Sequence, residues 1–228
     1  MRLVTFIFNR SNRDYRQLLK VWEASAEKHM PDVPRTVVWL DEPQKIKGDE
    51  ETQRHYDMCY AFLKAAEWVL EQNEDVIVTD VDLMFTGDMS EAFDMSFDIA
   101  VTKRQYRHPF NSGIWFFRNN KKARLFVHSW IGYTKDILKS KRLIRWARKK
   151  HGGIDQGSLS LAVDSCRDTV ALLPCRKWNA EQSSWADIDK DVRCIHIKSA
   201  MRQYCLGQRE DDPPKHIAGW VDMWKGYL

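Results

Sequence analysis

Two aspartates at the end of an apolar run are the residues of this chain best suited to do chemistry. In the segment DVIVTDVDLMF at 75–85, Asp80 and Asp82 follow the β-type run Val76–Thr79. Side chains at positions i and i+2 of an extended chain point to the same side, so both carboxylates should project together from the carboxyl end of a strand, where open α/β sheets bind ligands. Two carboxylates that close repel each other unless a cation lies between them. The pair therefore favours Mn²⁺ or Mg²⁺, although a helix cap beside a turn residue gives the same spacing.

Three further polar motifs follow the aspartate pair in a fixed order. They are FNSGIWFF at 110–117, GGIDQG at 152–157 and CIHIK at 194–198. Each also has a purely structural interpretation. Asn111-Ser112-Gly113 would suit a turn, Asp155 a helix N-cap, His196 a buried core position and Lys198 a solvated surface.

Together, the four motifs resemble those of the GT-A glycosyltransferases, the nucleotide-diphospho-sugar transferases that include the glycogenin-like galactosyl- and glucosyltransferases. The resemblance extends over residues 3–198. It implies an α/β fold of the GT-A (Rossmann-like) type, a mixed, mostly parallel sheet flanked by helices. It also implies metal-dependent transfer of a sugar from a nucleoside-diphosphate sugar, with a UDP-sugar as the expected donor, to a hydroxyl acceptor.

The resemblance assigns roles to particular positions of this sequence. Asp82 and His196 would be metal ligands, and Asp80 would join them or reach the ribose or a metal-bound water. Lys198 would contact the diphosphate. The chain departs from the family pattern after the histidine, where Ile-Lys-Ser replaces a glycine-containing stretch, and His216 is the alternative ligand. The other donor-site candidates are Phe8, Asn9 and Arg10 at the base and ribose, Arg54 and Lys64 at a phosphate or the sugar, and Asn111, Ser112 and Gly113 at the sugar.

The expected reaction explains these residue types. Negative charge develops on the departing nucleoside diphosphate, where a metal and a lysine stabilise it. The anomeric carbon becomes oxocarbenium-like, so a carboxylate helps electrostatically or as a base on the acceptor hydroxyl. Asp155 is the catalytic candidate for that carboxylate, with Gln156 beside it, and the two preceding glycines permit close approach of the backbone to the sugar.

A basic segment at residues 118–150 indicates an anionic partner. It holds twelve Lys and Arg residues against one acid, a charge of +11 in a chain whose net charge is +4. The segment ends beside Gly152, on the expected acceptor side. We therefore expect a polyanion there, for example DNA carrying a hydroxylated base that would be flipped out of a duplex. The residues expected to contact it are Lys139, Arg142, Arg145, Arg148 and Lys149.

Other functions fit part of the same pattern. The acceptor could be a glycan, a protein or a lipid, and an anionic membrane surface would also explain the basic segment. Paired carboxylates with a basic surface suit a metal-dependent nucleotidyltransferase or nuclease as well. A sugar-nucleotide-binding module without turnover is a further alternative, which the intact Asp80 and Asp82 disfavour.

The elements that must position these residues can be predicted from apolar periodicity. Strands are expected at 3–8, 36–40, 76–79, 99–101, 114–117, 170–173 and 192–197, and helices at 14–29, 53–72, within 121–150 and from 155 to 163. Alternation of strands and helices in the first 80 residues indicates a parallel-rich sheet covered on both faces.

Length and composition limit the remaining possibilities. The 228 residues, 43% of them hydrophobic, suffice for one GT-A domain over 1–228, with the tail 205–228 expected to pack over the donor site. No apolar run reaches the ~20 residues that span a bilayer. Five cysteines without a C-x-x-C pair disfavour disulfides and structural zinc, so a reducing cytoplasm is expected. Nothing in the sequence indicates an obligate protein partner.

Overall fold

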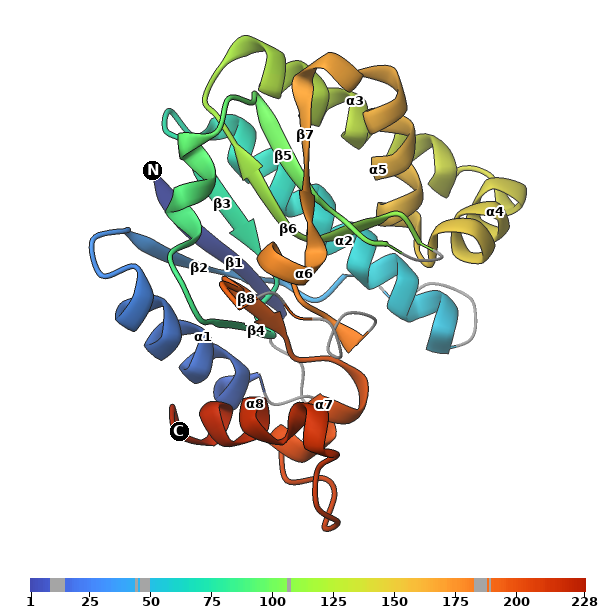
Figure 1. Cartoon of the computed structure of the whole chain (residues 1–228). Helices are drawn as coiled ribbons and strands as arrows, with labels where there is room; N and C mark the ends of the chain where they lie inside the picture. The colour runs from blue at the N-terminus through green and yellow to red at the C-terminus, as the bar shows by residue number, and fades with distance from the viewer. Residues whose placement is uncertain (9–14, 44, 46–49, 106–107, 183–187, 189) are drawn as a thin grey trace.

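The centre of the molecule is a mixed six-stranded sheet (Figure 1). A computed structural model describes residues 1–8, 15–43, 45, 50–105, 108–182, 188 and 190–228, with the backbone alone for 50–52. The strand order is β2-β1-β3-β6-β5-β7. Only β6 runs antiparallel to its neighbours, so the sheet is mostly parallel, as predicted. The strands are β1 (Arg2–Phe8), β2 (Arg35–Leu40), β3 (Val76–Thr79), β5 (Ile99–Lys103), β6 (Phe110–Phe117) and β7 (Val170–Pro174).

Helices cover both faces of this sheet, because successive strand residues alternate between two cores. On β3, Val76 and Val78 join one core, whereas Ile77 joins the other. The first core contains side chains of α2 (Glu50–Glu71), α3 (Lys121–Leu138) and α5 (Ile154–Ser165). The second contains α1 (Arg16–His29), η1 (Met89–Asp94) and α6 (Cys175–Trp178). A short η2 (Arg167–Thr169) precedes β7.

A two-stranded antiparallel sheet lies beside the main one. It pairs β4 (Leu83–Phe85) with β8 (Cys194–His196), and Leu83 is opposite His196. Because β3 ends at Thr79 and β4 begins at Leu83, the residues 80–82 form the crossover from one sheet to the other. The predicted strand at 192–197 is thus present but shorter, and β4 was not predicted.

The basic segment, predicted to be helical within 121–150, forms two helices. After α3, a new helix, α4 (Lys141–His151), begins at Ser140, whose hydroxyl accepts a hydrogen bond from the Leu143 N–H. It ends at Gly152, which has a left-handed φ of 85° that favours glycine. The break places α4 against α5, at the right-hand edge in Figure 1.

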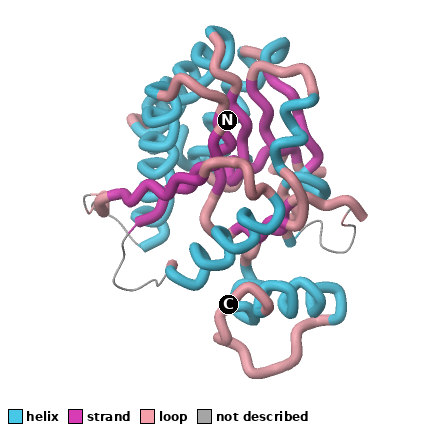
Figure 2. Tube along the Cα trace, turned by 90° about the vertical axis from the view of Figure 1, so that its left-hand side faces the viewer, coloured by secondary structure: helices cyan, strands magenta, loops and turns pink. Residues whose placement is uncertain are grey.

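The C-terminal part folds as α7 (Ser199–Cys205) and α8 (Lys215–Lys225), at the end of the molecule opposite α3 (Figures 1 and 2). Ile217, Val221 and Trp224 of α8 share a core with Val21 of α1 and Met84 of β4. All five cysteines are free in the structure. Among the described residues, no helix is long and apolar enough to cross a membrane.

Candidate functional site

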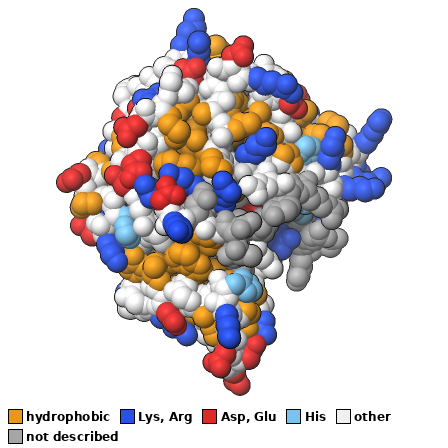
Figure 3. All heavy atoms as spheres, viewed as in Figure 1, with side chains coloured by type: hydrophobic (Ala, Val, Ile, Leu, Met, Phe, Trp, Pro, Cys, Tyr) orange, Lys and Arg blue, Asp and Glu red, His pale blue; other side chains and the backbone are white. Residues whose placement is uncertain are grey.

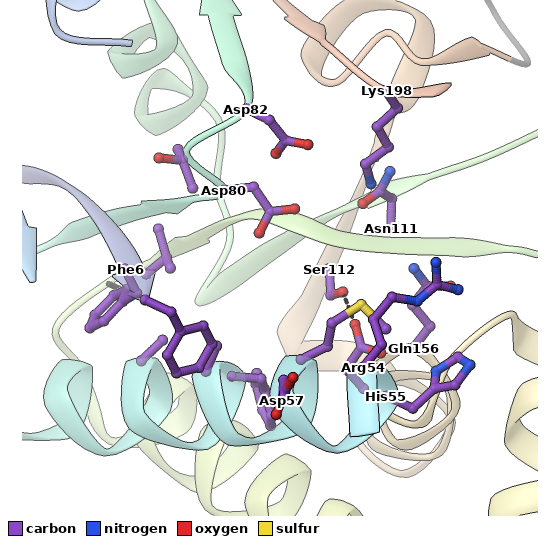
Figure 4. Close-up of a pocket in the computed structure, with 18 of the residues that line it drawn as sticks. Phe6, Arg54, His55, Asp57, Asp80, Asp82, Asn111, Ser112, Gln156 and Lys198 are labelled. Atoms are coloured by element: carbon purple, nitrogen blue, oxygen red, sulfur yellow. Dashed lines mark hydrogen bonds between the residues drawn. The ribbon is translucent and has the colours of Figure 1, made fainter. Parts of the chain in front are cut away.

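A pocket of about 510 Å³ opens at the carboxyl ends of β1 and β3. Its walls come from β1, α2, the 80–82 crossover, the start of β6, the start of α5 and the segment after β8. Figure 4 shows Asp80, Asp82 and Lys198 on one side and Arg54 and Asp57 of α2 across from them. Nine of the fourteen residues predicted for the metal, donor and catalytic sites therefore line one cavity.

Asp80, Asp82 and His196 form a cluster in which one ligand atom from each residue lies within 4.8 Å of the others. The Nε2 atom of His196 is 3.1 Å from Asp82 Oδ1 and 3.5 Å from Asp80 Oδ2. The Asp82 and His196 side chains are almost completely buried, whereas about half of the Asp80 side chain is exposed. Two carboxylate oxygens and one imidazole nitrogen are a donor set that Mn²⁺ accepts.

Backbone hydrogen bonds fix both aspartates where the chain changes sheets. The Asp80 N–H donates to the Gly113 carbonyl on β6 at 2.8 Å. The Asp82 carbonyl accepts from the Ile197 N–H, also at 2.8 Å. The aspartates thus converge through a bend that joins the two sheets, whereas the sequence predicted a continuous extended strand.

Gly113 is required by the crowding at this cluster. A Cβ atom added there would lie 2.6 Å from Asp80 Oδ2 and 2.7 Å from His196 Cε1. Both distances are shorter than real Cβ contacts, so any larger residue would displace a ligand. The N-S-G motif lies within β6 and not in a turn, and its glycine leaves room for the cluster.

The electrostatics of the cluster fit a divalent cation. Burial lowers the pKa of His196 well below its ordinary value of 6.5, so the imidazole is neutral at pH 7 and can act as a ligand. The Arg202 guanidinium of α7 pairs with Asp82 Oδ2 and donates from Nε to the Ile197 carbonyl at 3.0 Å. A positive group therefore already lies against the carboxylates, as their mutual repulsion requires.

Asp155 and the strand β6 form the other end of the pocket. Ser112 donates its hydroxyl to Asp155 Oδ2, and Asp155 is buried at the first turn of α5. Gln156 lines the same wall, beside Gly152. Asp155 is thus a pocket carboxylate rather than only a helix-start residue.

Asn111 is held by a buried ion pair. Its Nδ2 donates to Glu181 Oε2 at 3.1 Å, and its Oδ1 accepts from the Gly113 N–H at 2.9 Å. Glu181 in turn pairs with Arg104 at 2.5 Å. Burial raises the pKa of Glu181, but the Arg104 guanidinium lowers it more, so the group stays ionised and the Asn111 amide keeps one orientation.

Lys198 extends along the pocket wall towards Asn111 (Figure 4). The side chain is half-buried, and desolvation lowers the pKa of its ammonium group more than the nearby Asp80 carboxylate raises it. It forms no hydrogen bond or ion pair with the described part of the chain. Such a desolvated cation is available to an anionic ligand.

The helix α2 and the strand β1 form the remaining wall. Arg54 of α2 and Phe8 of β1 line the pocket, and the Phe8 ring stacks on Tyr60 with centroids 6.0 Å apart. Lys64 lies outside the pocket lining, where it pairs with Glu67 at 3.2 Å. Of the predicted donor-site residues, Asn9 and Arg10 lie outside the described part of the structure.

The helix α4 brings cations to the edge of the pocket, since Gly152 at its end lines the cavity. In Figure 3, Lys and Arg side chains project from the right-hand edge, where Figure 1 places α4. Five exposed cations of α4 form no ion pair among the described residues: Lys141, Arg142, Arg145, Lys149 and Lys150. Lys139, by contrast, pairs with Asp136 at 2.9 Å, and Arg148 is half-buried.

The sequence motifs did not point to four residues that contact the predicted ones. Arg202 touches Asp82, Asn179 touches His196, and Glu181 with Arg104 holds Asn111. None belongs to a recognisable local pattern.

Comparisons with known proteins agree with this geometry. Residues 32–141 match the family model described as nucleotide-diphospho-sugar transferase. The galactosyltransferase LgtC, solved with donor and acceptor sugar analogues, is 15% identical with a TM-score of 0.59, over 100% of this chain and 95% of that one. A glycosyltransferase involved in glycosylation of the major capsid of PBCV-1 is 12% identical with a TM-score of 0.54, over 89% and 97%.

GlyE from Streptococcus pneumoniae TIGR4 is 13% identical with a TM-score of 0.63, over 99% of this chain and 60% of that one. A search of curated protein sequences found no match. Identities this low establish a shared fold, which confirms the GT-A fold class predicted from the sequence.

Proposed function

We propose that the chain, which has the GT-A fold, is a nucleotide-sugar glycosyltransferase whose reaction depends on a divalent metal held by Asp80, Asp82 and His196. The observation that carries this proposal is the convergence of these three side chains at the pocket, with Gly113 leaving them room. The bound metal, Mn²⁺ or Mg²⁺, supplies charge stabilisation for the departing diphosphate.

Different residues of the pocket are proposed to bind the nucleoside, the diphosphate and the sugar of the donor. In this proposal Phe8 and Arg54 contact the nucleoside, and Lys198 provides positive charge for the diphosphate. Asn111, held by Glu181, lines the pocket where the sugar would bind. UDP is the nucleotide we expect, because the resemblance of the four sequence motifs implies a UDP-sugar donor.

Asp155 and Gln156 face the reacting sugar in this proposal. The Ser112 hydroxyl donates to Asp155 Oδ2, which orients the carboxylate while leaving Oδ1 as an acceptor. A carboxylate there stabilises the positive anomeric centre or takes the proton of the acceptor hydroxyl, and Gln156 can hydrogen-bond sugar hydroxyls.

Calorimetric titration of nucleoside diphosphates and their sugar conjugates tests the donor site. We expect binding with Mn²⁺ that EDTA abolishes, and its loss in Asp82→Asn. Asp168→Asn, an exposed aspartate on η2, is the matched control for removal of one carboxylate and should bind normally. Equal binding with Mn²⁺ and with EDTA would refute the metal-dependent mechanism.

We also propose that the acceptor is a hydroxylated base in DNA. The support is the group of five unpaired cations on α4, which ends at the pocket edge. Its apolar residues Ile144, Trp146 and Ala147 turn towards the protein, whereas Leu143 is exposed among the cations. Backbone phosphates on these cations would bring a flipped base to the pocket.

Binding to duplex DNA at several salt concentrations tests this acceptor. Arg145→Glu with Lys149→Glu should weaken binding and lower the salt slope by about 2, one unit per phosphate contact. Lys121→Glu with Lys215→Glu makes the same charge change on α3 and α8 and should have little effect. If both double variants behaved alike, or transfer occurred only to glycans or lipids, the DNA acceptor would be excluded.

A further inference from the structure

The two nitrogens of His196 face different surroundings. Nε2 faces the carboxylates of Asp80 and Asp82, whereas Nδ1 lies 2.9 Å from Asn179 Oδ1. Both His196 and Asn179 are fully buried, so water cannot replace either contact. A neutral imidazole carries its proton on one nitrogen only, and a metal ligand needs a lone pair on the other.

A hydrogen-bond chain determines which nitrogen carries the proton. The buried Thr102 hydroxyl donates its single hydrogen to the Asn111 carbonyl at 3.0 Å. It must therefore accept from the neighbouring amide, and Asn179 Nδ2 donates to it at 3.1 Å. This contact turns Asn179 Oδ1 towards His196. Since Asn179 Oδ1 can only accept, its contact with His196 is a hydrogen bond only when the proton is on Nδ1, and a cation at the carboxylates requires the lone pair on Nε2.

We propose that Asn179 and Thr102 are positioning residues that hold His196 in the tautomer with its lone pair on Nε2. The inference rests on the proposed metal-dependent function and goes further, since it assigns the orientation of the metal ligand to two residues outside the pocket lining. The opposite tautomer would direct an Nε2–H at the Asp82 carboxylate 3.1 Å away and fill the place of the cation with a proton.

The same series of hydrogen bonds connects the metal cluster to the sugar end of the pocket. Its last acceptor is the backbone carbonyl of Asn111, whose side chain faces the pocket on β6. Asn179 stands next to Ala180, which hydrogen-bonds to β8 on both sides of Ile195, through Cys194 and His196. Residues 179–180 thus fix the histidine through the backbone and through its ring.

Three substitutions separate this role from simple packing. Asn179→Leu removes the acceptor, and we expect metal affinity to fall 10- to 100-fold, the usual range for groups that orient a ligand histidine. Asn179→Asp keeps an acceptor at Nδ1 and should bind metal at least as tightly as the unmodified protein. Thr102→Val keeps the side-chain shape but frees the Asn179 amide to rotate, so an intermediate loss is expected.

The measurement is Mn²⁺ titration of each folded variant by calorimetry, with nitrogen-15 NMR of His196 in the metal-free protein at pH 8 as an activity-independent readout. A proton on Nδ1, together with rescue by Asn179→Asp, supports the inference. A proton on Nε2, or equal affinity losses in Asn179→Leu and Asn179→Asp, overturns it. If Asn179→Leu does not fold, the NMR result and Thr102→Val decide. Failure of the unmodified protein to bind metal would instead refute the proposed function.

Discussion

Substitution of Gly113 by alanine should damage the metal cluster more than its small size suggests. The added Cβ would lie 2.6 Å from Asp80 Oδ2 and 2.7 Å from His196 Cε1, whereas ordinary contacts begin at 3.4 Å. Relative to 3.4 Å, Asp80 Oδ2 is therefore about 0.8 Å too close and His196 Cε1 about 0.7 Å too close. Metal sites tolerate shifts of only about 0.2 Å in ligand distance.

The structure indicates which ligand would move. His196 is fully buried and bound to Asn179, so it can shift little, whereas the Asp80 side chain is half-exposed and can rotate away. Loss of one carboxylate from the cluster should lower Mn²⁺ affinity by at least about tenfold. Overpacking of the buried strand should also lower the free energy of unfolding by about 1–3 kcal/mol.

Calorimetry with Mn²⁺ and thermal unfolding measure the two effects separately. Gly132→Ala is the matched control, because nothing lies within 4 Å of the added Cβ on α3 and alanine favours a helix by up to ~1 kcal/mol. That variant should melt higher and bind metal normally. If Gly113→Ala kept both the melting temperature and the Mn²⁺ affinity of the unmodified protein, the crowded cluster deduced above would be wrong.

Three other predictions concern the helices around the pocket. Arg54→Ala should raise the KM for the nucleotide sugar, whereas Lys64→Ala on the same helix should leave it unchanged, because Lys64 lies outside the pocket and pairs with Glu67. Steady-state kinetics compare the two variants. Equal effects on KM would contradict the assignment of Arg54, and not Lys64, to the donor pocket. Arg202→Gln should enlarge the rise in melting temperature caused by Mn²⁺ alone, since the guanidinium no longer pairs with Asp82; a smaller rise would mean that Arg202 supports metal binding. Burial, with Lys150 and His108 nearby, lowers the pKa of His151 below 6.5. As the pH drops below about 6.5, the unfolded chain therefore binds the proton before the folded protein does. The free energy of unfolding then falls by up to ~1.4 kcal/mol per pH unit. In His151→Gln the acid-side decline in denaturation free energy should be shallower, and an unchanged slope would exclude this contribution.

The sequence alone determined most of the elements and the order of the motifs. Apolar alternation at 76–79 and helical spacing in α2 are local patterns, so their bounds were predicted to within a few residues. The two aspartates predicted a metal site, because a spacing of two residues in an extended chain places both carboxylates on the same side, where they repel each other. The break between α3 and α4 was missed, since a single serine cap within a continuous basic run is a weak signal.

The tertiary structure decided which residues complete the site. Asp82 and His196 are 114 residues apart, and Arg202 is 120 residues from Asp82, so only the pairing of β4 with β8 brings them together. Arg54 and Lys64 looked equivalent in sequence, but ten residues at 100° each put them about 80° apart around the helix, and only Arg54 faces the pocket. The direction of the Asn179 hydrogen bonds depends on Thr102, Asn111 and His196, three buried residues of separate strands. Local sequence specifies the face of its strand or helix to which each side chain points. The contacts between distant segments arise only when the two cores and the two sheets are packed.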